Sequence, residues 1–435
     1  MYFASSAFKY LFSVMPPEML NMRCRIHYLL PSLLLIASSV ASGQEALKMK
    51  PVDAERAQFD SLRKEGFEAL YNLDYEGANR RFKQIARQFP DHPAGLQFLA
   101  AALWAQTLNQ SRRLQASLYS SDSFFAQSED KVDPRTVAQF REWTQAAKQL
   151  AEARLKRNPG DVEALYFLGA AEGLKAAFAV AVERRFMAAL TDGSRSVERH
   201  RQVIKLDPNF HDAELTIGLY DYTVGGLPLP VKLLASIGGV RGSKKRGLET
   251  LQRVASEGRW AKDDAKSLLL VLYKREKRFG DALAISRELA AKYPRNFLLK
   301  LESADALVSL ANAARKESRL DVAASAEREV FTIFDALLRE RAASSYFDLI
   351  HFRYGETLLQ AGQPERAGRE FLAAANVKGA ETAVATMAHL RAAQSLDLAS
   401  RRSEALAEYR IVLARPDVYN AHEEAKRGLR EPYKR

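Results

Sequence analysis

The sequence of 435 residues contains few of the residues that mark several classes of protein. Its one cysteine, Cys24, lies close to the N-terminus, which excludes an intrachain disulfide and a metal site built from cysteines. Only 15 prolines and 22 glycines are present, so the composition is neither collagen-like nor that of a low-complexity chain. Alanine and leucine dominate and β-branched residues are sparse, which favours helix throughout.

Motifs that carry catalysis are also missing. The seven histidines form no metal-binding helical pair, and neither a Gly-x-Ser-x-Gly elbow nor an Asp-rich calcium loop occurs. The stretch GGVRGSKKRG has the order Gly-Ser-Lys, whereas a phosphate loop needs Gly-Lys-Ser or Gly-Lys-Thr. We therefore predict a protein that is not an enzyme, with no catalytic residue, metal or cofactor. The carboxylate pairs Asp263–Asp264 and Glu423–Glu424 are expected to cap helices or face water, and His389 to be satisfied between helices.

The N-terminal region contains the one long apolar run. The segment MRCRIHYLLPSLLLIASSVASGQ (22–44) has two arginines, then apolar residues, then small residues. This order is typical of a secretory signal peptide, and the run is too short to span a bilayer comfortably. We predict a signal peptide over 1–43, cleaved near Ala41–Gly43, and a linker over 44–57; residues 1–21 read as a mis-called start before Met22. The predicted location is the periplasm or the cell envelope.

The charge balance is basic, with a formal net charge of +12. In a cytosolic protein this would favour nucleic acid as a partner. Outside the cytoplasm nucleic acid is a poor partner, so we predict none. Anionic membrane or envelope surfaces, or acidic proteins, fit the charge better.

A pattern of large and small residues recurs along the chain. In its full form, an aromatic residue is followed three positions later by alanine and four positions after that by a second large residue. A proline eight positions further on ends the unit. The second helix of each unit is thereby predicted to approach the first closely. The copies are Tyr75–Ala78–Phe82–Pro90, Phe279–Ala282–Ser286–Pro294, Ala367–Phe371–Ala374 and Ala405–Tyr409–Val412–Pro416.

These copies, with a small residue such as Gly66 or Gly355 upstream, resemble the tetratricopeptide repeat, a helix–turn–helix unit of 34 residues. The resemblance implies an all-α, right-handed superhelical solenoid of about eight hairpins over 58–415, with a C-terminal capping helix and tail over 416–435. It also implies a protein or peptide partner, so the expected function is that of an exported, non-catalytic scaffold for protein interaction.

The period breaks in the middle of the array. Residues 111–133 are polar and aperiodic, which predicts a long loop. Two neighbouring units, 160–208 and 209–257, are each longer than 34 residues by roughly 15. In the first of these units, the apolar stretch 173–190 contains no proline, and no glycine after Gly173. We therefore expect one prolonged helix over about 161–190. In the second, glycines and prolines enlarge the turn.

This enlarged turn, within 220–251, resembles a segment of a eukaryotic tetratricopeptide family associated with the mitochondrial outer membrane and inclusion bodies. The resemblance is carried by Pro228, Leu233, Gly239, Arg241–Gly242 and Gly247–Leu248. The 227–246 part is both apolar and basic, so it is open to three interpretations: packing on the array, a lid that contacts a partner, or contact with a membrane surface. We favour packing; the candidate surface residues are Leu229, Leu233, Leu234, Arg241, Lys244 and Lys245.

The resemblance to the repeat family also implies a peptide groove along the first helices. Its inward positions carry Tyr166, Leu215, Leu219, Tyr222, Val271, Lys274, Arg275, Phe352 and Glu356. The alternative for each residue is packing against the neighbouring first helix. A carboxylate clamp is not supported, because the family's asparagine positions carry residues such as Ala170, Leu219 and Val271.

Overall fold

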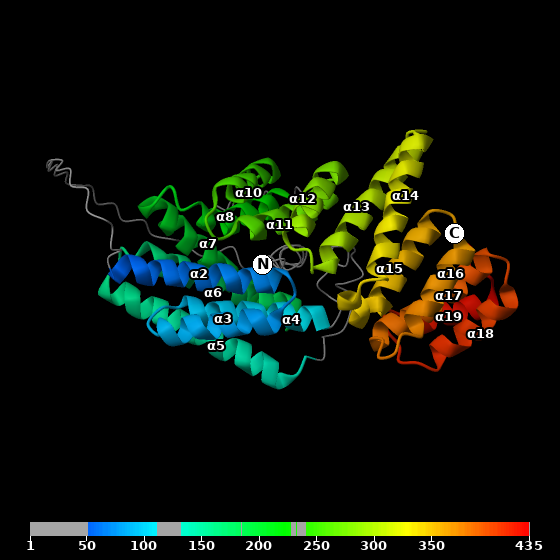
Figure 1. Cartoon of the computed structure of the whole chain (residues 1–435), viewed down its shortest axis with the longest axis horizontal. Coiled ribbons are helices and arrows are strands. Elements are labelled where there is room, and N and C mark those ends of the chain that lie inside the picture. The colour runs from blue at the N-terminus through cyan, green and yellow to red at the C-terminus, as the bar shows by residue number, and fades with distance from the viewer. Residues whose placement is uncertain (1–50, 111–131, 184, 228–231, 233–240, 435) are drawn as a thin grey trace.

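The computed structural model describes residues 51–110, 132–183, 185–227, 232 and 241–434. Within these ranges the regular structure is helical, without a strand (Figure 1). The helices are α2 (Pro51–Tyr71), α3 (Tyr75–Gln88), α4 (Ala94–Gln110), α5 (Pro134–Arg157), α6 (Val162–Ala181), α7 (Phe186–Leu206), α8 (Glu214–Gly225), α10 (Lys244–Glu257), α11 (Lys262–Arg275), α12 (Phe279–Lys292), α13 (Phe297–Lys316), α14 (Leu320–Leu337), α15 (Phe347–Gln360), α16 (Pro364–Ala375), α17 (Thr382–Leu398), α18 (Arg402–Leu413) and α19 (Ala421–Arg430).

These helices pair as successive hairpins, from α2–α3 to α17–α18, and α19 packs on the last pair. Each helix packs mainly against its neighbours in sequence, as a stacked array requires. The predicted all-α superhelical repeat fold is confirmed.

The recurring residues lie where the two helices of a hairpin meet. Ala78 and Phe82 are fully buried, and a Cβ placed on Gly66 would lie 2.3 Å from Phe82 Cε1. The same pair returns near the C-terminus, where a Cβ on Gly355 would lie 2.8 Å from Phe371 Cδ1. Glycine therefore lets the aromatic ring of the second helix lie on the backbone of the first, which accounts for the repeat pattern.

The hairpins share one turn geometry. Leu73, Lys277, Ser318 and Ser400, which join the two helices of four hairpins, have positive φ angles of 62°, 58°, 59° and 60°. Gly362 occupies the same place between α15 and α16, with φ of 73°. Residues other than glycine have a steric penalty in this left-handed region of φ. The packing of the stacked helices therefore imposes the turn.

The enlarged hairpin α6–α7 differs from its prediction. Instead of one helix over 161–190, α6 ends at Ala181 and α7 begins at Phe186. Arg185 N donates to Ala179 O at 2.8 Å across the turn, and the extra length is divided between helices of 20 and 21 residues. The prediction of a single helix that continues to about 190 is wrong, because a stretch without proline can still turn where the second helix packs back on the first, and α6 therefore ends at Ala181.

Three of the predicted segments, the linker, the long loop and the C-terminal tail, overlap only partly with the residues that the structure describes. Helix α2 starts at Pro51, inside the stretch predicted as linker. The predicted loop 111–133 lies between α4 and α5, and 111–131 falls outside the described residues, as do the predicted signal peptide and most of the enlarged turn. The C-terminal tail contains the ten-residue helix α19.

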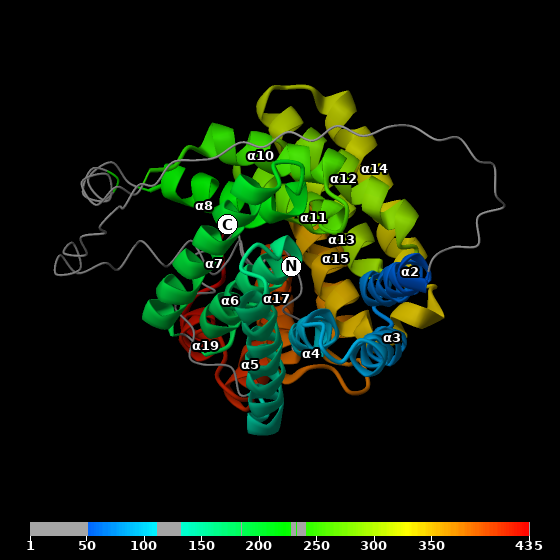
Figure 2. The same ribbon diagram turned by 90° about the vertical axis from the view of Figure 1, so that its left-hand side faces the viewer.

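The first hairpins curve until α2 meets the later helices of the array. The rings of Tyr71 and Tyr293 stack with centroids 4.9 Å apart, and Asn296 Nδ2 donates to Tyr71 O at 2.7 Å. Arg295 N donates to Asn72 Oδ1 at 3.2 Å. Figure 2 shows this arrangement, with α2 to one side, α7 and α8 to the other, and α11 between them. The first helices α2, α4, α6, α8 and α11 thus face a common interior.

Candidate functional site

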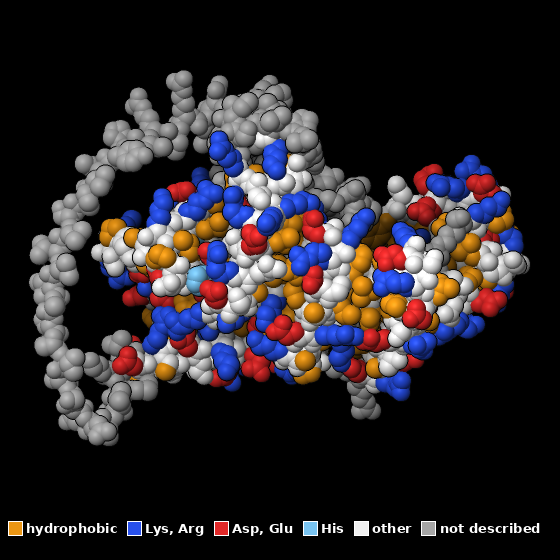
Figure 3. All heavy atoms as spheres, turned by 90° about the horizontal axis from the view of Figure 1, so that it is seen from above, with side chains coloured by type: hydrophobic (Ala, Val, Ile, Leu, Met, Phe, Trp, Pro, Cys, Tyr) orange, Lys and Arg blue, Asp and Glu red, His pale blue; other side chains and the backbone are white. Residues whose placement is uncertain are grey.

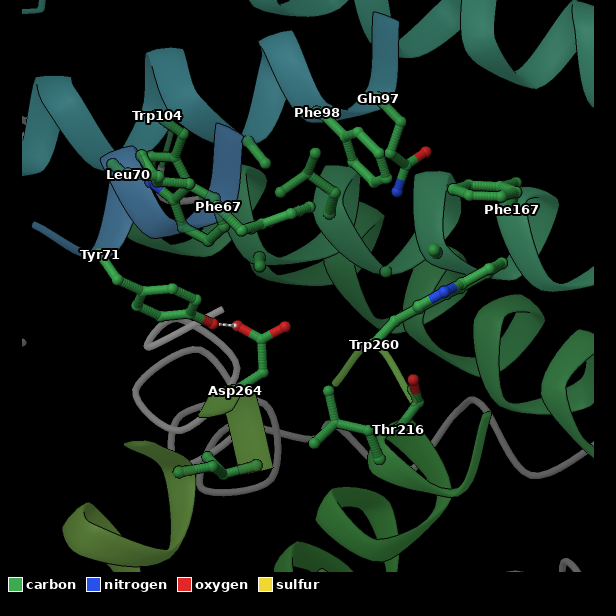
Figure 4. A pocket seen from close by; sticks show the side chains of 18 of the residues that line it. Phe67, Leu70, Tyr71, Gln97, Phe98, Trp104, Phe167, Thr216, Trp260 and Asp264 are labelled. Carbon is green, nitrogen blue, oxygen red and sulfur yellow. Dashed lines mark hydrogen bonds between the residues drawn. The ribbon is translucent and has the colours of Figure 1, made fainter. Parts of the chain in front are cut away.

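The common interior contains a cavity of about 160 Å³ (Figure 4). Its wall is mostly apolar and aromatic, and it is formed by the inward faces of α2, α4, α6, α8 and α11 with the starts of α3 and α13. An engineered apolar cavity of about 150 Å³ is known to bind benzene, so this volume suits roughly one aromatic ring. The lining includes Phe67, Leu70, Tyr71, Phe98, Trp104, Tyr166, Phe167, Leu174, Leu215, Leu219, Trp260 and Leu268.

One side of the cavity carries a carboxyl group. Asp264, in the first turn of α11, accepts a hydrogen bond from the Tyr71 hydroxyl of α2, as Figure 4 shows. Enclosure away from water raises the pKa of Asp264 above that of an ordinary aspartate. Enclosure, reinforced by this carboxyl, also holds the pKa of Tyr71 well above its usual value, so Tyr71 stays a neutral donor.

Several further polar groups of the wall, Gln97 and Trp260 among them, have a buried atom without a hydrogen-bond partner among the described residues. Gln97 of α4 is only 7% exposed, and its Oε1 accepts no hydrogen bond from the described residues. The indole Nε1 of Trp260 is likewise buried without an acceptor among them. Both residues line the cavity. Because an unsatisfied buried polar atom costs roughly 1–3 kcal/mol, these atoms are natural contacts for a bound group.

Trp260 is held in place by cations on its faces. The guanidinium groups of Arg56, Arg63 and Arg259 lie 5.7, 5.6 and 5.6 Å from its ring centroid. Arg63 also lines the cavity; burial lowers its pKa, and Asp60 lies 3.7 Å from it as counter-charge. These cation–π contacts join α2 to the loop before α11 and so close the wall of the cavity.

Behind the wall lies a buried histidine. His200 of α7 is 2% exposed; its Nε2 lies 3.1 Å from Tyr166 O and its Nδ1 lies 2.8 Å from Thr216 Oγ1. The carbonyl can only accept, so Nε2 carries the proton and the Thr216 hydroxyl donates to Nδ1. Burial lowers the pKa of His200 to about 4, so the imidazole is neutral near pH 7. Tyr166 and Thr216 both line the cavity, so His200 fixes part of its wall.

The structure divides the predicted groove residues into three groups. Tyr166, Leu215 and Leu219 lie together on the cavity wall. Tyr222, Val271, Lys274 and Arg275 lie farther along α8 and α11. Phe352 and Glu356 lie on α15, outside the cavity lining.

Members of the second and third groups contact neighbouring helices. Tyr222 donates to Glu276 Oε1 at 2.6 Å and has the Arg275 guanidinium 5.7 Å from its ring centroid. Val271 is buried, and Lys274 pairs with Glu302 at 2.8 Å and with Asp305. Phe352 packs edge-to-face on Phe371, and Glu356 accepts from Arg353 at 2.9 Å. A role for any of them in binding a partner stays a prediction.

The predicted surface patch is described only in part. Leu229, Leu233 and Leu234 lie outside the described residues. Lys244 pairs with Glu276 at 2.7 Å, Lys245 lies 3.9 Å from Glu249, and Arg241 is exposed. Figure 3 shows Lys and Arg interspersed with Asp and Glu over one face of the molecule, so the cations there are not gathered in a single patch.

The described ranges contain no candidate metal site and no candidate membrane span. No three His, Asp or Glu side chains come together there as metal ligands do. None of the helices there is long and apolar enough to cross a membrane.

The sequence pattern missed most of the polar residues of the cavity. Asp264 was expected to cap a helix or face water, but it lies on the cavity wall and binds Tyr71, because α2 returns to cover the start of α11. Glu423, by contrast, is exposed. His389 has the predicted interhelix partner, with its Nδ1 2.7 Å from Glu408 Oε2. Gln97, Tyr71 and Trp260 gave no signal in the sequence, since contacts across the turn of a superhelix have no fixed spacing.

No protein-family model matches the chain, and no curated protein matches it either. Among solved structures, it is similar to the human IFIT1 dimer with m7Gppp-AAAA, with 12% identity over 86% of this chain and 85% of that chain and a TM-score of 0.42. Yeast Tom70 is 12% identical over 88% of this chain and 89% of that chain, with a TM-score of 0.34. A tetratricopeptide repeat protein from Parabacteroides merdae is 13% identical over 77% of this chain and 99% of that chain, with a TM-score of 0.29. At these TM-scores none of them bears on a ligand of this chain.

Proposed function

We propose that this protein is a non-catalytic scaffold that binds a protein or peptide partner, and that the interior cavity receives an apolar group of that partner. The observation behind this proposal is the cavity itself, whose aromatic wall encloses unfilled space and buried polar atoms that have no hydrogen-bond partner among the described residues. An apolar group entering it would leave water on binding, and these polar atoms would fix its orientation. Export to the cell envelope, based on the predicted signal peptide, is part of the same proposal.

The partner binds to the first helices of the hairpins rather than to the outer surface of the array. Leu215 and Leu219 of α8 and Tyr166 of α6 belong to both the predicted groove and the cavity wall. In a helical repeat array the inward helices present such side chains from several units at once, so one extended segment contacts several repeats.

Filling the cavity tests the proposal. Ala170 lines the cavity, and the substitution Ala170→Phe would place a ring in it. The matched control is Ala324→Phe, at an exposed position in the second turn of helix α14. A photo-crosslinking residue at Leu219, used in an envelope extract, would report a partner at the wall. We expect Ala170→Phe to abolish the crosslinked product and Ala324→Phe to retain it.

Equal crosslinking in the two variants would contradict binding through the cavity. Circular dichroism would verify that both variants are folded. If Ala170→Phe does not fold, Ala170→Leu is the smaller replacement, with Ala324→Leu as its control.

A further inference from the structure

Three buried polar atoms on the cavity wall limit which groups can fill it. Arg63 Nε and Trp260 Nε1 are N–H donors without an acceptor among the described residues, and Asp60 lies 3.7 Å from Arg63 Nε, too far for a hydrogen bond. Gln97 Oε1 is an acceptor without a donor among the same residues. Arg63, Trp260 and Gln97 all line the cavity. The wall therefore offers a ligand two donors and one acceptor.

These atoms reach the cavity from different sides. In Figure 4, Gln97 projects from α4 in the upper part of the view, and Trp260 lies below it, in the loop before α11. The rings of Phe98 and Phe167 line the same part of the cavity. A group that satisfies both Gln97 and Trp260 therefore carries its donor and its acceptor on different atoms, beside an apolar part.

The charges around Trp260 disfavour a cation. The guanidinium groups of Arg56, Arg63 and Arg259 lie 5.7, 5.6 and 5.6 Å from its ring centroid. Asp264, the carboxyl group of the cavity wall, already accepts a hydrogen bond from the tyrosine hydroxyl of α2. A cation entering the cavity would meet three like charges.

The carboxylates among these guanidinium groups disfavour an anion as well. Asp60 lies 3.8 Å from Arg56 and 3.7 Å from Arg63, and it pairs with Arg259. Glu163 pairs with Arg56 at 3.0 Å. The guanidinium groups are thus compensated within the protein, so an anion that left water for the cavity would gain little to offset its desolvation. A neutral polar group avoids this cost.

We propose that the cavity binds an uncharged amide group next to an apolar group about one aromatic ring in size. A secondary amide has one N–H donor and a carbonyl oxygen with two lone pairs, which matches the two donors and one acceptor of the wall. Gln97 Oε1 accepts from the N–H, and Trp260 Nε1 and Arg63 Nε donate to the carbonyl oxygen. An aromatic residue within a peptide chain has this combination, and so does a small aromatic amide. This inference rests on the proposed function, since it assigns the ligand chemistry of the same cavity.

Calorimetric titration of the full chain at pH 7.5 tests the assignment with four probes of nearly the same shape. Benzamide carries a donor and an acceptor, and acetophenone replaces the amide nitrogen by a methyl group. Benzoate is the corresponding anion, and protonated benzamidine is the corresponding cation. We expect benzamide to bind at least about fivefold more tightly than each of the others, since acetophenone leaves Gln97 unsatisfied and the two ions are costly to desolvate.

The variant Gln97→Met keeps the length of the side chain and removes its amide. In this variant benzamide should lose its advantage over acetophenone, and acetophenone should bind at least as tightly as before. The matched control is Gln106→Met, which lies on the same helix α4 but not on the cavity wall and should retain the preference. The four probes on the wild type need no variant, so they decide the question even if Gln97→Met does not fold.

A peptide distinguishes the two sources of the amide. The peptide is Gly-Gly-Phe-Gly-Gly, acetylated at its N-terminus and amidated at its C-terminus, so that it carries no charge. Tighter binding of this peptide than of benzamide assigns the site to an aromatic residue within a peptide chain, and the reverse order assigns it to small aromatic amides.

The outcomes separate this inference from the proposed function. Equal affinities of benzamide and acetophenone, tighter binding of either ion, or a preference that survives Gln97→Met would overturn the amide assignment while leaving the cavity as a binding site. Absence of binding by every probe would overturn it as well. The proposed function fails separately, when Ala170→Phe retains the crosslinked partner.

Discussion

One buried histidine contributes a defined part of the pH dependence of folding. The pKa of His200 is lowered by burial from 6.5 to about 4. Between these two values the unfolded chain binds a proton at this position and the folded chain does not. Stability contributed by the neutral imidazole is therefore present above pH 6.5 and is lost as the pH falls toward 4.

The magnitude can be worked out for a change from pH 7.5 to pH 5.0. At pH 7.5 both states are almost unprotonated, so the linkage contribution is near zero. At pH 5.0 the unfolded histidine is mostly protonated and the folded one is mostly neutral, which destabilises the folded state by about 2 kcal/mol. Full loss below pH 4 would be on the order of 3 kcal/mol.

Tryptophan fluorescence during urea unfolding is the appropriate assay. All three tryptophans, Trp104 of α4, Trp143 of α5 and Trp260 of the loop before α11, belong to the helices around the cavity, and two of them line it. The control is His200→Gln, which does not titrate. Because the raised pKa of Asp264 acts in the opposite direction and is present in both proteins, the wild type and the variant are compared by their change between the two pH values.

We expect the wild type to lose about 2 kcal/mol more than His200→Gln between pH 7.5 and pH 5.0. An identical loss in the two proteins would refute the reasoning. It would mean that His200 is protonated in the folded state as readily as in the unfolded one, and so that it does not donate to Tyr166 O as a neutral ring.

Three other predictions concern the array itself. Gly66→Ala should destabilise it by about 1–3 kcal/mol in urea unfolding, because the new Cβ meets Phe82, whereas Gly280→Ala, with open space around its Cβ, should not destabilise it. Lys277→Gly should raise the free energy of unfolding by up to about 1 kcal/mol, because glycine adopts the positive φ without a steric penalty. A decrease in this free energy would contradict a turn that the stacked helices impose. Lys274→Met should lower stability in thermal unfolding by up to about 3–5 kcal/mol, because the buried Glu302 and Asp305 lose a shared cation, although Asp305 retains Arg353 at 2.8 Å; a neutral result would contradict a stabilising role of this ion pair.

The residues that could be predicted are those that act within one hairpin. Ala78, Phe82, Ala367 and Phe371 lie in the predicted interfaces and are fully buried, because the contact between two adjacent helices recurs with the period of the repeat. Tyr166, Leu215 and Leu219 were placed on the inward face by the resemblance to the repeat family. The division of the 161–190 stretch into two helices was missed, since the end of α6 depends on where its neighbours stop.

The sequence alone determined the helical hairpins and their approximate number, because local packing between neighbours in sequence leaves a periodic signal. The tertiary structure alone decided that α2 returns to meet α11 and α13, and so that Tyr71 reaches Asp264 and the wall closes around a cavity. This closure depends on the summed small rotations of many stacked hairpins and on contacts between residues about 200 positions apart, such as Tyr71 and Asp264. No short spacing in the sequence records such a sum.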